Sequence, residues 1–270
     1  MLREIVNGVK TQIGNRVLNR EKITELALAA FFAGGHVLLT GPSGLGKTVW
    51  AGALAQAMGL SFKKELFMHD YPSEPSFSQV YMAKQIASAP SRAKSSLLEA
   101  MDDQAQFFII ATMDEGQILP EPLKDRFMLS LNIAYPGIAA EKQLLMLHNE
   151  AKKELAPYPV CNQEAIQQAK REVAAITVEE PIFNYIISIV ETTRRVGAFA
   201  SGASPRGSKA LLEAAKVYAA IHGRDYCTTD DVRNMAPHVL RHRVKLQPEA
   251  IQEGLQVDTI IEGILAGRKT

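Results

Sequence analysis

The sequence predicts an α/β fold, a parallel sheet with flanking helices, followed by an all-helical lid domain. Between residues 36 and 135, short apolar runs rich in β-branched and aromatic residues alternate with segments of helical spacing. This alternation is typical of a parallel sheet covered by helices. From about residue 140 onward, only helical patterns occur. We therefore expect an α/β nucleotide-binding domain over residues 1–137 and a helical lid domain over residues 138–270.

The first domain is expected to contain five strands. Apolar residues at helical spacing predict two helices within residues 1–34, before the first strand. Further helices are predicted over residues 49–58, where Gly59 ends the pattern, and over residues 91–101. The five predicted strands cover residues 36–40, 62–68, 80–83, 107–113 and 128–135.

The second domain is expected to be built from amphipathic helices alone. Pro136 and Gly137 separate it from the last predicted strand. The predicted helices cover residues 140–155, 163–176, 180–196, 204–223, 228–244 and 257–267.

Composition limits the classes of function. The chain has 270 residues, is 47% hydrophobic and 22% charged, and carries a formal net charge of +1. These values indicate a globular protein and argue against a nucleic-acid-binding tail or a polybasic membrane anchor. No apolar run approaches the 18 residues that a membrane span needs, and the N-terminus lacks the pattern of a signal peptide. We expect a cytoplasmic protein that binds neither nucleic acid nor membrane.

Cysteine and histidine give no sign of a metal centre. Cys161 and Cys227 lie far apart and lack the spacing of metal ligands, so reduced thiols are expected. The six histidines show no metal-ligand spacing either. No metal site is therefore expected beyond a nucleotide-bound Mg²⁺.

The strongest local signal is a glycine-rich loop between a predicted strand and a predicted helix. It fits the pattern G-x-x-x-x-G-K-[ST], whose backbone N–H groups surround phosphate oxygens. Lys47 could reach the β- and γ-phosphates of ATP, and the hydroxyl of Thr48 could ligate Mg²⁺. The expected nucleotide contacts are Gly41, Pro42, Ser43, Gly44, Leu45, Gly46, Lys47, Thr48 and Val49.

Four stretches resemble the MoxR family of AAA+ ATPases. They are AGGHVLLTGPSGLGKT at residues 33–48, KSSLLEAMDD at 94–103, ILPEPLKDRFMLSLNIAYP at 118–136, and the lid segment 202–244 that begins GASPRGSKALLEAAKVYAAIHG. The C-terminal residues 248–266 are similar to the closing helices of that family. The resemblance covers nearly the whole chain and implies an AAA+ P-loop core with a helical lid.

The resemblance implies further functional residues and partners. Arg206, in the G-A-S-P-R motif, would touch the γ-phosphate from the lid, and Arg126, in the D-R-F motif, looks like a finger that reaches a neighbouring subunit's nucleotide. Ile13 and Gly14 resemble the family's contact to the adenine base. The family forms hexameric rings, hydrolyses ATP with Mg²⁺, acts like a chaperone in assembly or maturation of partner proteins, and often works beside a von Willebrand A domain protein.

The sequence departs from this family after the third predicted strand. The family places an Asp-Glu pair there to hold Mg²⁺ and activate water, whereas this chain has Lys84 and Gln85. Glutamine keeps the shape of glutamate but removes the general base, a loss that commonly costs about 10²–10⁴-fold in rate. The ammonium of Lys84 could neutralise phosphate, but it cannot orient the water molecules that coordinate a metal.

Asp114 is the leading candidate for a replacement acid. It ends the fourth predicted strand, at a position where the family has a water-positioning asparagine. If the third and fourth strands are parallel neighbours, their ends lie roughly 5 Å apart, so Asp114 could act beside the phosphates. Asp70, Glu74 and Glu99 are weaker candidates.

Three functional hypotheses remain open from the sequence. The segments between Asp70 and Lys84, between Asp102 and Phe107, and between Glu115 and Leu119 are shorter than the family's substrate-gripping insertions. The chain could be a MoxR-type ATPase with a replaced acid, or a pseudo-ATPase ring subunit that binds ATP structurally and lends Arg126 to active neighbours. A third possibility, another P-loop class such as a small-molecule kinase, agrees poorly with the lid sequence.

Overall fold

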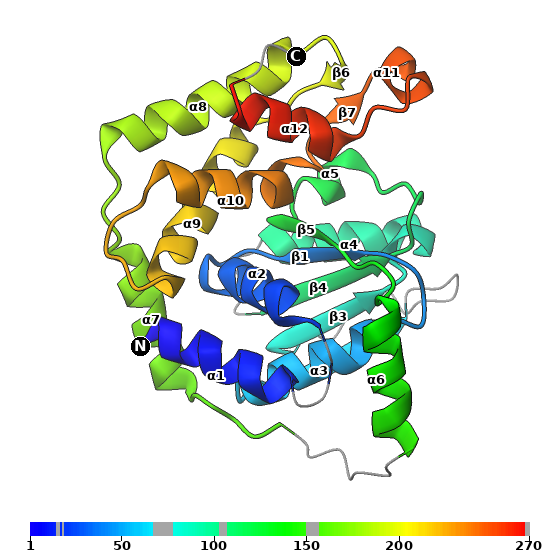
Figure 1. The fold of residues 1–270 in the computed structure, drawn as a ribbon, viewed down its shortest axis with the longest axis vertical. Coiled ribbons are helices and arrows are strands. Elements are labelled where there is room, and N and C mark those ends of the chain that lie inside the picture. The colour runs from blue at the N-terminus through cyan, green and yellow to red at the C-terminus, as the bar shows by residue number, and fades with distance from the viewer. Residues whose placement is uncertain (15–16, 18, 67–77, 103–106, 150–156, 268–270) are drawn as a thin grey trace.

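The structure of the chain is a computed structural model that describes residues 1–14, 17, 19–66, 78–102, 107–149 and 157–267. Its centre is a five-stranded sheet in the order β2-β3-β4-β1-β5, with every neighbouring pair parallel (Figure 1). The strands are β1 (Val37–Thr40), β2 (Phe62–Leu66), β3 (Val80–Lys84), β4 (Phe108–Met113) and β5 (Leu129–Asn132). The predicted parallel sheet is therefore confirmed.

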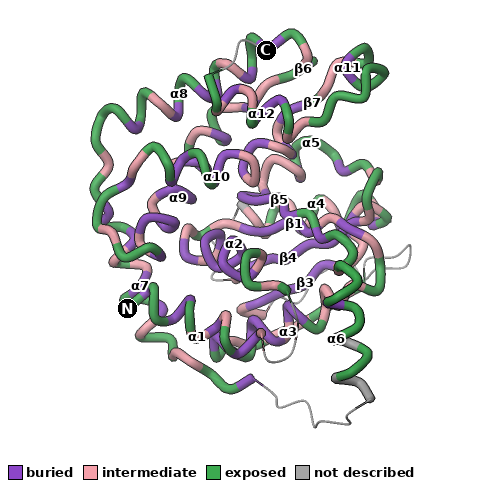
Figure 2. The backbone as a smooth tube through the Cα atoms, in the orientation of Figure 1, coloured by how far each residue is buried: buried purple, intermediate pink, exposed green. Residues whose placement is uncertain are grey.

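Helices cover both faces of the sheet, and alternating side chains of the strands pack against them. One face packs with α1 (Leu2–Gly14), α2 (Glu21–Phe32) and α3 (Lys47–Ala57) in an apolar cluster that includes Val37 and Ile110. The other face packs with α4 (Ser91–Asp102) and α5 (Glu121–Lys124) in a cluster that includes Leu38 and Ile109. In Figure 2 the central strands are buried along most of their length. Burial on both faces explains why their sequences read as continuous apolar runs.

The remaining helices follow the sheet. A 3₁₀ turn (Ile86–Ser88) follows β3, and α6 (Ile138–Asn149) follows β5. After α6 come α7 (Gln163–Ala174), α8 (Glu180–Arg195), α9 (Pro205–Ile221), α10 (Thr229–Leu240), α11 (Pro248–Gln252) and α12 (Val257–Leu265).

The lid is helical as predicted, and it also contains a short two-stranded sheet that was not predicted from the sequence. β6 (Phe199–Ser201) and β7 (Lys245–Leu246) pair antiparallel. Strands of two or three residues are too short to show a periodic pattern, which is why their sequences gave no strand signal.

The lid packs directly on the α/β part of the chain. Helix α9 lies at its centre, against α8 and α10, and it also contacts α1 and α2. One apolar cluster therefore runs from the sheet into the lid. The domain boundary at residues 137 and 138 stays a prediction. Within the described part of the chain, no helix has both the length and the apolar character that crossing a bilayer requires.

Candidate functional site

The glycine-rich loop connects the carboxyl end of β1 to the first turn of α3. Gly41 has φ 149°, and a Cβ atom there would lie 2.1 Å from the backbone oxygen of Ile133, so only glycine fits. Gly46 precedes α3 with φ 71°, in the left-handed region that glycine tolerates best. The chain thus turns sharply and leaves the N-terminus of α3 facing the loop, the arrangement that favours phosphate binding.

Lys47 lies folded over this loop. Its ammonium donates hydrogen bonds to the backbone oxygen of Gly41 and, at 3.0 Å, to that of Pro42. Burial lowers the pKa of Lys47, the carboxylate of Asp114 opposes this shift, and the charge of Arg20 adds to it. Lys47 and Asp114 are therefore close enough to interact electrostatically.

Arg20 is a contact of the loop that the sequence analysis missed. Its guanidinium donates a 3.1 Å hydrogen bond to the backbone oxygen of Leu45, and burial lowers its pKa. No motif surrounds Arg20 in the sequence, so only the fold reveals that it adds positive charge beside the loop.

A cavity of about 540 Å³ lies over the loop and the ends of two strands. Residues 43–49 form one wall. The opposite wall includes Lys84 and Gln85 at the end of β3, and Thr112 and Asp114 at the end of β4. β3 and β4 are parallel neighbours with Ala83 opposite Ala111, so the strand ends meet as the sequence predicted.

Asp114 faces the loop within this cavity. Its carboxylate accepts a 3.4 Å hydrogen bond from the hydroxyl of Ser43, and its backbone N–H donates to the side-chain oxygen of Gln117 at 3.0 Å. Asp114 is half-buried and lines the cavity together with Lys47 and Thr48. The structure thus brings together the predicted phosphate-binding residues and the candidate replacement acid.

Of the three weaker acid candidates, the structure describes Glu99 alone. Glu99 is exposed on α4 and does not line the cavity wall. Asp70 and Glu74 lie outside the described residues, as does most of the shortened segment between Asp70 and Lys84.

Gln85 adopts an unusual backbone conformation beside the loop. Its φ is 55°, in the left-handed region, where residues other than glycine are uncommon. Its backbone N–H donates a 3.1 Å hydrogen bond to the hydroxyl of Thr112 on β4. This bond holds the end of β3 against β4 and keeps Gln85 at the cavity wall.

The cavity does not fit a Mg²⁺ ion held by protein carboxylates. Among the described residues of its wall, Asp114 supplies the one carboxylate, and the other side-chain oxygens are neutral groups of Ser43, Thr48, Gln85 and Thr112. Across all described residues, no group of three or more His, Cys, Asp or Glu side chains could hold a metal ion. The last residue of β3 is Lys84, whose side chain carries an ammonium group and not an acid.

Arg126 and Arg206 lie together at the other end of the strands. The backbone N–H of Met128 donates to the oxygen of His36 at 2.9 Å, which places the D-R-F turn at the amino end of β1. The glycine-rich loop follows the carboxyl end of this four-residue strand, about 13 Å away at the usual rise per residue. Arg206 lies 3.7 Å from the carboxylate of Asp125, and its charge, after burial, contributes to lowering the pKa of Arg126.

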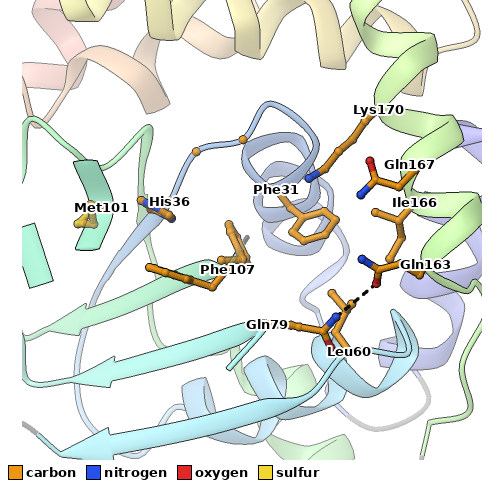
Figure 3. A pocket seen from close by; sticks show the side chains of 13 residues that line it. Phe31, His36, Leu60, Gln79, Met101, Phe107, Gln163, Ile166, Gln167 and Lys170 are labelled. Carbon is orange, nitrogen blue, oxygen red and sulfur yellow. Dashed lines mark hydrogen bonds between the residues drawn. The ribbon is translucent and has the colours of Figure 1, made fainter. Parts of the chain in front are cut away.

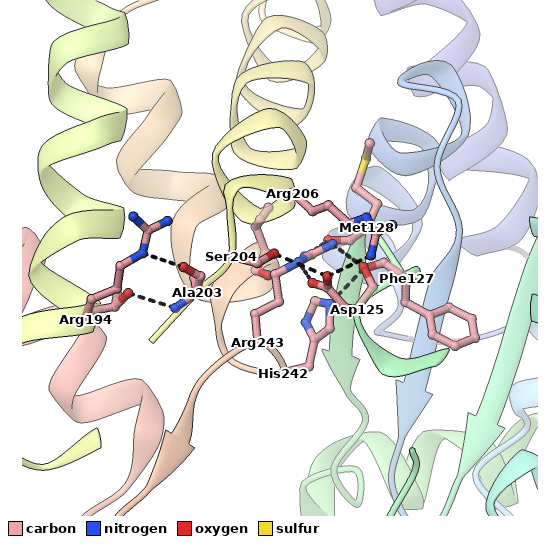
Figure 4. Close-up of polar contacts among 11 residues, drawn as sticks. Asp125, Phe127, Met128, Arg194, Ala203, Ser204, Arg206, His242 and Arg243 are labelled. Atoms are coloured by element: carbon pink, nitrogen blue, oxygen red, sulfur yellow. Dashed lines mark hydrogen bonds and ion pairs between the residues drawn. The ribbon is translucent and has the colours of Figure 1, made fainter. Parts of the chain in front are cut away.

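A buried arginine, Arg243, joins the lid to this turn (Figure 4). Its guanidinium donates to the carboxylate of Asp125 at 2.9 Å, and to the backbone oxygens of Phe127 at 2.8 Å and Met128 at 3.0 Å. Its side chain is only 3% exposed. Ser204 also donates to Asp125, at 3.2 Å. We call Asp125, Ser204 and Arg243 the lid clamp, a feature that the sequence analysis missed because its members lie in three separate segments.

The predicted base contact is only partly accessible. Ile13 is 1% exposed and packs in the apolar core, whereas Gly14 ends α1 and is half-buried. The side chain of Ile13 therefore cannot stack on a base, and any adenine contact here would come from Gly14 or from the backbone.

A second cavity, of about 440 Å³, lies where the strands begin (Figure 3). Phe31, His36 and Phe107 line it, and the ammonium of Lys170 from α7 lies over the ring of Phe31, 5.2 Å from its centroid. None of the residues predicted to bind nucleotide line it.

Comparisons with known proteins agree with this architecture. The sequence pattern of the AAA lid domain matches residues 191–264. The uncharacterized protein YeaC of Bacillus subtilis is 34% identical, over 94% of this chain and 92% of its own length. Chaperone MoxR1 of Mycobacterium tuberculosis is 26% identical, over 92% of this chain and 78% of its own. A crystal structure from Cytophaga hutchinsonii, of a protein assigned as an ATPase, superposes with a TM-score of 0.91 at 26% identity, covering 99% and 95% of the two chains.

Proposed function

Because this chain belongs to the MoxR family of AAA+ ATPases, we propose that it binds ATP and acts in the chaperone-like assembly or maturation of partner proteins. The observation that carries ATP binding is the cavity in which residues 43–49 face Asp114 and Lys84. The chaperone-like role is proposed by analogy with a relative whose name describes it as a chaperone.

ATP is the proposed ligand, with its phosphates on the loop from Gly41 to Thr48. The N–H groups at the start of α3 and the ammonium of Lys47 would hold the β- and γ-phosphates. Mg²⁺ would arrive bound to ATP, with the hydroxyl of Thr48 as its protein contact. Gly14 would lie near the base.

Arg126 and Arg206 would act as a pair on the nucleotide of a neighbouring subunit. Both lie at the amino end of the sheet, whereas the loop that binds this chain's own nucleotide lies at the carboxyl end. A paired action in trans requires an oligomeric ring, which we propose to be a hexamer, of this chain alone or mixed with a relative. Positive charge supplied in this way stabilises the transition state of phosphoryl transfer.

Hydrolysis by the chain is proposed to be slow, with Asp114 as the group that positions the attacking water. Asp114 is the only carboxylate among the described residues that line the cavity. Its hydrogen bond from Ser43 directs it toward the loop. Gln85 can form hydrogen bonds with water but cannot accept its proton.

A second candidate function is favoured by the two residues at the end of β3, Lys84 and Gln85. With Lys84 and Gln85 at the cavity wall, the chain could be a pseudo-ATPase subunit that binds ATP as a structural ligand and contributes Arg126 to active neighbours. We propose a von Willebrand A domain protein as a partner of either form. We place both forms in the cytoplasm.

Steady-state ATP turnover by the purified chain with Mg²⁺ separates the two candidates. Lys47→Ala serves as the control that removes phosphate binding. Turnover that disappears in Lys47→Ala and falls in Asp114→Asn would support a slow ATPase that uses Asp114. ATP binding without turnover above the Lys47→Ala control would support the pseudo-ATPase. Failure to bind ATP would contradict both.

A further inference from the structure

Lys84 adds a positively charged side chain to the wall of the cavity over the glycine-rich loop. It is the last residue of β3, it is half-buried, and it lines the same cavity as Lys47 and Thr48. The strand pairing fixes this position, because β3 is hydrogen-bonded to β2 on one side and to β4 on the other. Its backbone therefore has little freedom to move away from the loop.

The ammonium of Lys84 has no competing acid within the described part of the chain. No carboxylate there lies within ion-pair distance of it. The one described carboxylate of the cavity wall, Asp114, accepts a hydrogen bond from Ser43 and interacts electrostatically with Lys47. An anionic ligand would thus be the natural partner of Lys84.

A lysine at position 84, where the family has an acid, changes the local charge by as much as a bound Mg²⁺ ion would. Replacing an acid by a lysine changes the local charge by two positive units, which is the charge of Mg²⁺. Metal-free ATP likewise carries two more negative charges than its Mg²⁺ complex. A site with Lys47 and Lys84 on its walls therefore matches the charge of metal-free ATP better than a site with an acid at position 84 does.

We propose that Lys84 is a fixed counter-ion for the triphosphate, so that this chain binds metal-free ATP about as tightly as it binds the Mg²⁺ complex. The inference rests on the proposed binding of ATP and adds how that binding depends on metal. Lys84 lies on a strand inside the sheet and needs no metal to be positioned. Nucleotide could then be retained as a structural ligand when Mg²⁺ is scarce.

Isothermal titration calorimetry of the purified chain with ATP, in buffer containing Mg²⁺ or EDTA, tests the proposal. For the unmodified chain we expect the two dissociation constants to agree within about threefold. Lys84→Met keeps the length of the side chain and removes its charge. In EDTA it should weaken ATP binding roughly ten- to a hundredfold, the usual cost of losing a hydrogen bond to a charged group. In Mg²⁺ the loss should be smaller, because the metal neutralises the phosphates.

Two further variants make the result specific. Lys84→Arg keeps the charge and should restore binding in EDTA. Lys64→Met removes an exposed lysine from the neighbouring strand β2, outside the cavity, and should bind ATP like the unmodified chain. Thermal melting of each variant by circular dichroism shows whether it is folded.

These measurements distinguish a failure of the inference about Lys84 from a failure of the proposed function. ATP binding by the unmodified chain that disappears in EDTA and is unaffected by Lys84→Met would overturn this inference and leave the proposed function intact. An absence of ATP binding in both buffers, by a folded unmodified chain, would overturn the proposed function and this inference with it.

Discussion

Two neighbouring residues at the end of β3, Lys84 and Gln85, decide what chemistry the cavity can perform. They line the wall opposite the phosphate-binding loop, where the family to which this chain belongs carries an Asp-Glu pair. The hydrogen bond from the backbone of Gln85 to Thr112 keeps that part of the strand against β4. At positions 84 and 85 the cavity wall therefore has no carboxylate.

Restoring both acids should raise activity. We expect the double variant Lys84→Asp, Gln85→Glu to hydrolyse ATP at least about a hundredfold faster than the unmodified chain, because it regains a general base beside the phosphates. Steady-state turnover with Mg²⁺ measures this, with Lys64→Asp as a matched control on β2. Equal turnover of the double variant and the unmodified chain would mean that more than these two residues limits hydrolysis.

Arg243 is expected to stabilise the contact between the lid and the sheet. It forms hydrogen bonds with Asp125, Phe127 and Met128 while almost fully buried. Arg243→Met should destabilise the fold by about 3 kcal/mol, the typical cost of breaking a buried ion pair. Chemical denaturation measures the change. Arg195→Met, which breaks an exposed pair with Glu191, should cost at most about 0.5 kcal/mol, and equal losses in the two variants would contradict the role of the lid clamp.

At the scale of elements, the strands and helices that form the cavity could be predicted from the sequence, and the lid clamp could not. Apolar runs and the glycine-rich pattern predicted β1, β3 and β4, and the parallel neighbours β3 and β4 follow from the fold class. Arg20 and Arg243 were missed because their partners lie 25 and 118 residues away in the chain. Local patterns carry no information about contacts at such separation.

Helix α10 shows how a local signal supports the lid. Thr228 and Asp231 form a capping box at its start, and Arg224 donates to both carboxylate oxygens of Asp231, at 2.6 and 2.5 Å. Thr228→Ala should lower the free energy of unfolding by about 1 kcal/mol, since a backbone N–H loses its acceptor. Thr229→Ala is the neighbouring control. A loss in the control as large as that in Thr228→Ala, measured by urea denaturation, would argue against the cap.

The whole molecule should become less stable as pH falls from 7 to 4. Burial lowers the pKa of His36 and of His238 to about 4, and it lowers the pKa of His242 well below 6.5. Each stays neutral in the folded chain but takes up a proton in the unfolded chain below about 6.5. Their contribution to stability is therefore complete above pH 6.5 and is lost as pH decreases toward 4.

The share of His36 in this pH dependence can be isolated. His36 Nδ1 accepts a 3.2 Å hydrogen bond from the backbone N–H of Ile109, and an asparagine oxygen could accept it instead. Between pH 7 and pH 4, the free energy of unfolding of His36→Asn should fall by roughly 3 kcal/mol less than that of the unmodified chain. Urea denaturation at the two pH values measures this, and an identical pH dependence in both proteins would exclude the effect.

The proposed binding of ATP and the proposed role of Lys84 both depend on one arrangement, a triphosphate held between the glycine-rich loop and Lys84. A crystal structure of the chain with a non-hydrolysable ATP analogue and Mg²⁺ tests it most directly. We predict phosphates surrounded by residues 41–48, with the Lys84 ammonium about 3 Å from a phosphate oxygen. A structure with Lys84 turned away from the phosphates, and the metal held between Thr48 and Asp114, would contradict it.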